Sequence, residues 1–186
     1  MSASDVEIDM YNELANIGGG NAATALSQML NARVSLGLPE TAELTLGDIE
    51  QLIGDGSGEV AVTILTTVGD LAGTIVLLMS DPDAIGDALG VTDEFLASAL
   101  GEIGNIVGSR FLISVGEMMM IEGEIEPPAV GFAPRAAALE TVVALAAESE
   151  PFFVLRTDLD IDVLHEHNEL LYFPAESTIE RLRGMC

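Results

Sequence analysis

The sequence has no lysine and no tryptophan, and its single cysteine is the last residue, Cys186. The missing lysine excludes a P-loop nucleotide site, in which a lysine follows the last glycine. One cysteine cannot form an intramolecular disulfide, and we do not expect a terminal thiol to act as a nucleophile. Aromatic residues make up only 4% of the chain, while hydrophobic residues make up 49%. The core must therefore consist mainly of Ala, Val, Ile, Leu and Met.

Long hydrophobic runs are also missing. The best candidates are Leu71–Met79 and the stretch from Ala136 to Ala147, which Glu140 interrupts. Both are shorter than the roughly 20 apolar residues of a helix that crosses a bilayer. Residues 1–10 are acidic and lack the basic and apolar regions of a signal peptide. We therefore expect a soluble, cytoplasmic protein without a membrane partner.

Positive charge is scarce, because six arginines face 31 acidic residues and the formal net charge is −25 at pH 7. Such a chain repels nucleic acid, so we expect no nucleic-acid partner. The acids could form a docking surface for a basic partner, or a solvated shell suited to concentrated salt, which screens their repulsion. We favour the shell, because many acids without lysine are typical of cytosolic proteins from extreme halophiles.

The hydrophobic spacing predicts one α+β domain over residues 1–186, with two long helices packed on one face of a mostly antiparallel sheet. The predicted helices are Asp5–Asn31, Asp81–Leu89, Asp93–Met120, Ala136–Ala147 and Ser177–Arg183. The predicted strands are Ala32–Leu38, stopped by Pro39, then Glu59–Thr66, Leu71–Met79, Ile121–Ile125, Phe152–Asp162 and Glu169–Phe173. Glycines predict a turn at Gly54–Gly58.

The order of these elements runs twice, over about residues 5–80 and 92–174, which predicts a duplicated domain with pseudo-two-fold symmetry. Both halves carry an acidic residue or Ser, then Glu after four positions, Asn after three more, and Pro after 23 more. Every member of one set is 89 residues from its counterpart. The two sets are Asp9, Glu13, Asn16 and Pro39, and Ser98, Glu102, Asn105 and Pro128.

Helix geometry places the polar residues of each set together, because positions i, i+4 and i+7 lie on one helix face. The small residues Gly20 and Ser109 continue the two faces. A polar stripe next to small residues allows the backbone of another protein to approach closely.

This repeated pattern resembles the active-site signature of the CheC, CheX and FliY phosphatases. Two copies in one chain resemble CheC, and the similarity extends to the segments ELANIGGGNAATALSQML, EIGNIVGS and LLYFPAESTIERL. Nothing in the sequence resembles the additional domain that FliY carries for the flagellar switch.

The resemblance implies a chemotaxis phosphatase that hydrolyses the phosphoaspartate of a CheY-type response regulator without a covalent intermediate. Asn16 and Asn105 would each orient a water molecule, and Glu13 and Glu102 would pair with the active-site lysine of the regulator. The regulator would supply Mg²⁺ as well as the phosphoryl group, so the chain would need no metal or cofactor of its own.

The remaining members of the two sets have supporting roles in this hypothesis. Pro39 and Pro128 would end strands near the sites and shape them, while Asp9 and Ser98 receive no specific role. We expect the second site to be the stronger one, because Gly18–Gly20 weaken the first helix after Asn16. Those glycines either serve close docking or make that turn loose.

The resemblance also implies a second class of function, an adaptor that binds and regulates the receptor deamidase CheD. The helix Ala136–Ala147, with Glu140, lies where the CheD-docking helix of the family falls. A third class, a structural component of a motor switch, is the least favoured.

Two further patterns predict ordinary structure. Asp158, Asp160, Asp162 and Glu169 match acidic positions of a calcium loop, but Val163 replaces the required Gly and the acids alternate with apolar residues, as in a half-buried strand. Met118–Met120 is expected to be core and the end of a helix, in preference to a binding surface.

Overall fold

The computed structural model describes residues 5–54, 58–147 and 149–184. Cys186 and residues 55–57 of the predicted turn lie outside the described residues. The helices are α1 (Asp5–Leu30), the short 3-10 helix η1 (Leu46–Asp48), α2 (Ile49–Ile53), α3 (Pro82–Leu89), α4 (Asp93–Met119), α5 (Arg135–Ala146) and α6 (Glu176–Arg183). The strands are β1 (Val34–Leu36), β2 (Glu40–Leu44), β3 (Glu59–Gly69), β4 (Gly73–Ser80), β5 (Gly123–Ile125), β6 (Ala129–Pro134), β7 (Phe152–Ile161) and β8 (Leu164–Pro174).

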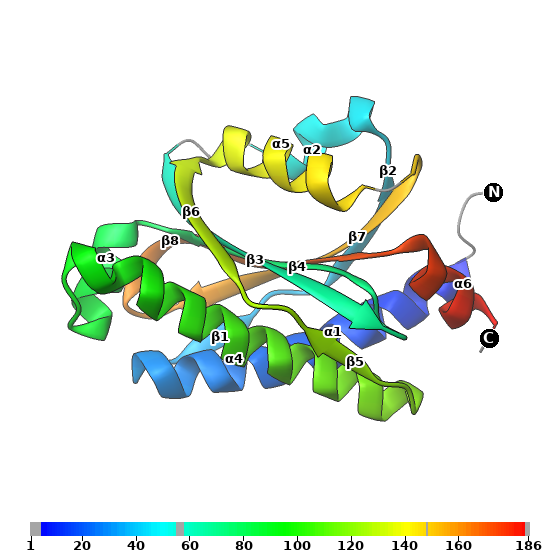
Figure 1. The fold of residues 1–186 in the computed structure, drawn as a ribbon, viewed down its shortest axis with the longest axis horizontal. Helices are drawn as coiled ribbons and strands as arrows, with labels where there is room; N and C mark the ends of the chain where they lie inside the picture. Colours follow the sequence, from blue (N-terminus) through cyan, green and yellow to red (C-terminus); the bar gives the residue numbers. More distant parts are fainter. Residues whose placement is uncertain (1–4, 55–57, 148, 185–186) are drawn as a thin grey trace.

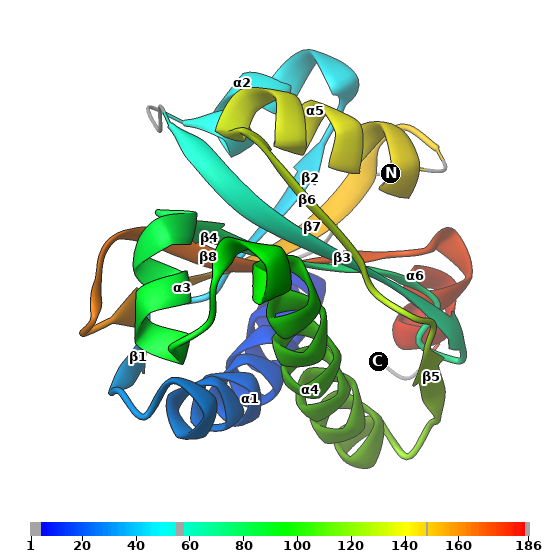
Figure 2. The same ribbon diagram turned by 60° about the vertical axis from the view of Figure 1, so that its left-hand side comes forward.

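The strands form one antiparallel sheet with the order β1-β7-β8-β4-β3-β5, in which β2 also pairs with β7 and β6 with β3. α1 and α4 lie side by side against one face of the sheet, and α2 and α5 cover the other face (Figures 1 and 2). The predicted class, an α+β fold with two long helices on one face of an antiparallel sheet, is confirmed.

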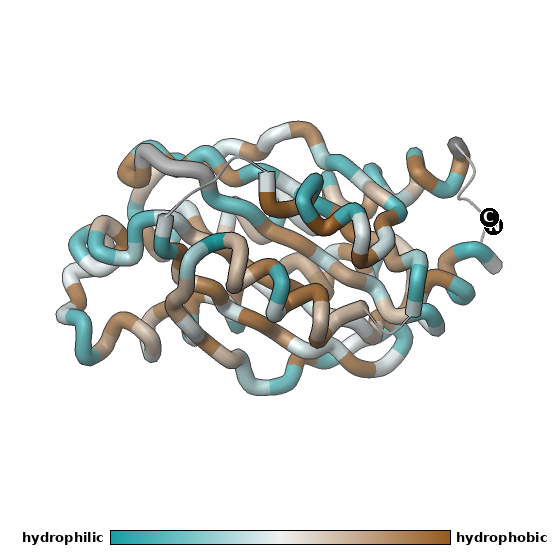
Figure 3. Tube along the Cα trace, turned by 90° about the horizontal axis from the view of Figure 1, so that it is seen from above, coloured by the Kyte–Doolittle hydropathy of each residue, from teal (hydrophilic) through white to brown (hydrophobic). Residues whose placement is uncertain are grey.

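The two sides of the sheet have separate hydrophobic cores. The larger core lies between the sheet and the helix pair α1/α4, and the smaller one lies under α2 and α5. Hydrophobic stretches follow the strands through the middle of the molecule in Figure 3. No helix in the described residues is long and apolar enough to cross a membrane.

Glycines allow the two long helices to pack closely. A Cβ atom added at Gly18 of α1 would lie 2.6 Å from the Phe111 ring of α4 and 3.0 Å from the Val115 side chain. A Cβ atom added at Gly104 of α4 would overlap the Thr63 side chain of β3. Because Gly18 and Gly104 have no side chains, α4 can pack closely against both α1 and the sheet.

The sequence prediction missed β2, α2 and β6, but the predicted edge strand does end before Pro39, because β1 ends at Leu36. β1 and β2 both pair with β7, with Leu36 opposite Leu159 and Glu40 opposite Arg156, so pairing resumes directly after the proline. Proline has no N–H to donate, and it is tolerated here because it interrupts an edge strand instead of a central one.

A buried ion-pair network anchors α5 to the sheet. The Arg135 guanidinium at the start of α5 pairs with Glu169 of β8, and both side chains are buried. Arg135 Nε also donates to the Ile53 carbonyl at the end of α2, at 3.0 Å. The Arg156 side chain of β7 reaches the same Glu169 carboxylate. Glu169 is thus a structural counterion.

Candidate functional site

The first predicted pair, Glu13 and Asn16, is exposed on α1, while the intervening Leu14 and Ala15 are buried in the core. This alternation follows from the helical period, which turns one side of α1 to the sheet and leaves the polar stripe in solvent. Asp9, one turn earlier, is also exposed.

The second pair, Glu102 and Asn105, is exposed on α4, and the intervening Ile103 and Gly104 are buried. Ser98 is exposed one turn earlier. α1 and α4 run in opposite directions in Figure 1, and each pair lies near the middle of its helix.

Pro128 lies beside the second pair. A Cβ atom added at Gly101, the residue before Glu102, would be 3.6 Å from Pro128 Cγ and 3.6 Å from the Val130 side chain. Because Gly101 has no side chain, the segment between β5 and β6 packs directly against the helix turn that carries Glu102. Pro39 takes the corresponding place between β1 and β2 and is half-buried.

The glycines after Asn16 do not break the helix, because α1 continues through them to Leu30. Gly18 packs against α4, and a Cβ atom at Gly19 would contact Thr157 and Leu36 at 3.5 and 3.6 Å. Gly20 is half-buried, with a Cβ position 3.8 Å from Leu36. Gly18 and Gly19 therefore serve packing, and the first pair stands on a continuous helix.

The four paired side chains are available to a partner. Among the described residues, neither Glu13 nor Glu102 takes part in an ion pair, and neither Asn16 nor Asn105 has a hydrogen-bond partner for its amide. An exposed amide can accept from water with its oxygen and donate with its NH₂, and an exposed carboxylate can receive a cation from a docked protein.

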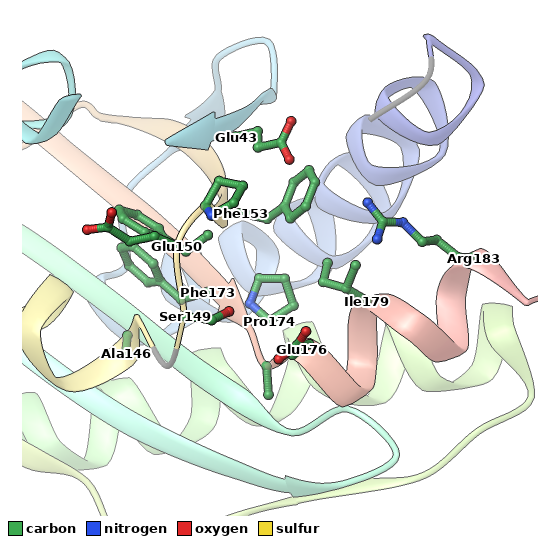
Figure 4. A pocket seen from close by; sticks show the side chains of 13 residues that line it. Glu43, Ala146, Ser149, Glu150, Phe153, Phe173, Pro174, Glu176, Ile179 and Arg183 are labelled. Carbon is green, nitrogen blue, oxygen red and sulfur yellow. The ribbon is translucent and has the colours of Figure 1, made fainter. Parts of the chain in front are cut away.

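A separate cavity of about 240 Å³ lies between β2, the β7 strand and α6, and contains none of the predicted site residues (Figure 4). Its floor includes the rings of Phe153 and Phe173, and Arg183 stands at one side. Arg183 Nε donates to Glu7 of α1 at 2.6 Å, which raises the pKa of the guanidinium. This charged hydrogen bond between Arg183 and Glu7 holds α6 against α1.

No group of three or more His, Cys, Asp or Glu side chains that could hold a metal ion occurs in the described part of the chain. Sequence reasoning missed the buried Arg135–Glu169–Arg156 network. The only signal in the sequence was Glu169, an acid in a hydrophobic strand. This residue had been compared only with the acidic positions of a calcium loop.

The CheC-like family matches residues 1–39 of the chain. The CheY-P phosphatase CheC of Bacillus subtilis is 25% identical over an alignment of 193 positions, which covers 95% of this chain and 91% of that protein. Among solved structures, FliY from Thermotoga maritima has a similar fold, with a TM-score of 0.73 and 22% identity over 99% of this chain and 97% of that one. A chain of the CheX–CheY–BeF3–Mg²⁺ complex from Borrelia burgdorferi matches with a TM-score of 0.56 and 18% identity, over 88% of this chain and 96% of that one.

Proposed function

We propose, because the chain is CheC-like in sequence and in fold, that it hydrolyses the phosphoaspartate of a CheY-type response regulator in the cytoplasm. One observation carries the proposal. Two Glu/Asn pairs, 89 residues apart in the sequence, both stand exposed on long helices and have no partner within the described chain. The name of the Bacillus subtilis relative, a CheY-P phosphatase, supports the choice of substrate.

In the proposed reaction, Asn16 or Asn105 holds a water molecule in line with the phosphorus of the regulator's phosphoaspartate. The amide oxygen accepts a hydrogen bond from the water, and the NH₂ group can donate to a phosphoryl oxygen. Catalysis then consists of positioning the nucleophile, which lowers the entropic part of the barrier. The regulator contributes the phosphoryl group and Mg²⁺, so this chain supplies no metal.

Glu13 and Glu102 dock the regulator by pairing with its active-site lysine. Each carboxylate lies one helical turn before its asparagine, so one docking event places the amide as well. The small residues Gly20 and Ser109 follow one turn later, and both are half-buried. Their small side chains leave room for the regulator backbone along the stripe.

The test is an assay of regulator dephosphorylation with this chain in catalytic amount. The wild type should shorten the lifetime of the phosphorylated regulator, Asn105→Ala should reduce the rate strongly, and the double variant Asn16→Ala/Asn105→Ala should abolish it. Asn21→Ala, which changes an exposed asparagine of α1 outside the two sets, should leave the rate unchanged. A double variant that is folded by circular dichroism and fully active would refute the proposal.

A second candidate function, an adaptor for CheD, is favoured by the outer face of α5. The exposed side chains of this helix are Ala136, Ala137, Glu140, Thr141, Ala144 and Leu145. Only one of them is charged, in a protein with a net charge of −25. This face lies across the sheet from α1 and α4, so both functions can coexist (Figure 2). Leu145→Glu should prevent CheD binding in a titration and leave regulator dephosphorylation intact; equal binding by the variant would remove this candidate.

A further inference from the structure

An open groove of about 880 Å³ lies between the C-terminal part of α4 and the neighbouring strands β3 and β5, near the β5 label of Figure 2. Large apolar side chains line it and remain in solvent: Met120 is 90% exposed, Ile113 is 51% exposed and Val68 is 38% exposed. Met118 is also exposed, while Met119 is buried. The expectation that the three methionines lie at a helix end is confirmed, but the expectation that they are core is wrong for Met118 and Met120.

The fold itself does not require these apolar residues. At the 89-residue offset, the first half has Asn31 in place of Met120 and Thr24 in place of Ile113. Asn31 and Met120 both end their long helices with left-handed backbone, at φ values of 48° and 54°. Asparagine is among the residues that tolerate this conformation best, whereas a long side chain such as methionine adopts it at a cost.

Met120 thus carries two costs at one position, because it is strained in its backbone and almost fully exposed in its side chain. Residues in strained backbone conformations concentrate at sites of binding and function. Methionine is flexible and polarisable, and exposed methionines are common on surfaces that bind helical partners. A partner that covers the Met120 side chain removes its apolar surface from water, and the free energy gained in this way offsets the cost of the backbone conformation.

The rim of the groove determines the sign of that partner's charge. Glu117, Glu122 and Glu124 are exposed around the apolar residues. A second copy of this chain would bring these carboxylates against its own, with like charges opposed. β5 is only three residues long, which is too short an edge for an added strand to gain much pairing. The groove therefore suits a positively charged, amphipathic helix.

We propose that the groove of Val68, Ile113 and Met120 is a docking site for a basic amphipathic helical segment of a partner protein. Its apolar face covers Ile113 and Met120, and its Lys or Arg side chains meet the glutamate rim. Ile113 lies eight residues beyond Asn105, about 12 Å along the helix axis. The proposal does not depend on the phosphatase activity.

The test uses a labelled, roughly 14-residue helical peptide of Leu and Lys, and the same composition in scrambled order as control. Fluorescence anisotropy gives the affinity at one fixed salt concentration, and spectra of ¹³C-methyl methionine locate the site. The helical peptide should shift the Met120 methyl signal and leave that of buried Met79 unchanged. The double variant Met120→Asn/Ile113→Thr introduces the residues found at the equivalent positions of the first half. It should weaken peptide binding about tenfold or more.

Leu46→Thr removes an exposed apolar side chain on the opposite face of the sheet, and it should bind as the wild type does. Met120→Asn should melt at the same or a higher temperature than the wild type, which separates lost binding from lost folding. Equal affinity of all variants, an unmoved Met120 signal or equal binding of the scrambled peptide would each overturn the proposal. A dimer of the free chain that Met120→Asn dissociates would overturn it too, in favour of a second copy.

Discussion

Arg156 of β7 and Glu169 of β8 form an ion pair of 2.5 Å between adjacent strands, and the Glu169 carboxylate is completely buried. Arg135 reaches the same carboxylate from α5, so one acid pairs with two of the six arginines of the chain. Two of the few cations of this acidic protein therefore belong to a buried network. The network joins the sheet to the helix layer that carries the second candidate function.

Replacing Glu169 with Gln should destabilise the protein by about 3 kcal/mol or more, because removal of one partner leaves buried charge uncompensated. Chemical denaturation monitored by circular dichroism measures this change. Glu140→Gln, which removes an exposed acid of α5, is the matched control and should alter the stability by less than about 0.5 kcal/mol. Equal stability of the two variants would show that Glu169 is solvated.

Gly104→Ala should destabilise the fold by roughly 1–3 kcal/mol, because the added methyl group overlaps the Thr63 side chain. The strain falls next to Asn105, so regulator dephosphorylation should drop as well. Thr63→Ser removes the overlapping methyl group and should restore most of the stability when combined with Gly104→Ala. If Gly104→Ala melts like the wild type, α4 does not approach β3 as closely as described.

Glu13→Lys/Glu102→Lys should abolish docking of the phosphorylated regulator, because two like charges in the interface cost several kcal/mol. Both positions are exposed, so the folded state should tolerate the change. Titration at a fixed salt concentration measures the affinity, since salt weakens exposed ion pairs. The exposed pair Glu50→Lys/Glu180→Lys makes the same charge change on α2 and α6, away from both sites, and should bind far better. Equal loss in both double variants would assign the effect to net charge.

The thermal unfolding temperature should rise markedly between about 0.1 M and 2 M KCl, because salt shortens the Debye length from about 10 Å at 0.1 M to about 3 Å at 1 M. The net charge of −25 repels itself more strongly in the compact state than in the unfolded chain. Mild acidification toward about pH 5 should reproduce part of the effect by protonating some carboxylates. A melting temperature that stays flat across the salt series would contradict the solvated-shell interpretation.

The sequence was sufficient for the two long helices and for the exposure of Asn16 and Asn105, because helical spacing determines both. It was insufficient for β2 and β6, which lie at the sheet edge and begin directly after prolines, where local preferences argue against a strand. The pairing of Arg135 with Glu169 joins residues 34 positions apart, and no local pattern indicates it. The exposure of Met120 could not be predicted from the sequence either, because a hydrophobic residue at the end of a core helix is expected to be buried.

The strand order has a consequence for the history of the chain. β1 and β2 of the first half pair with β7 of the second, and β5 and β6 of the second half pair with β3 of the first. Neither half can complete a sheet from its own strands, so a single-repeat ancestor would have had to fold as an intertwined dimer. Fusion of two such subunits replaces a concentration-dependent assembly with an intramolecular one. Under the predicted duplication, each copy of the site is also free to differ from the other, and the two sets differ at Asp9 and Ser98.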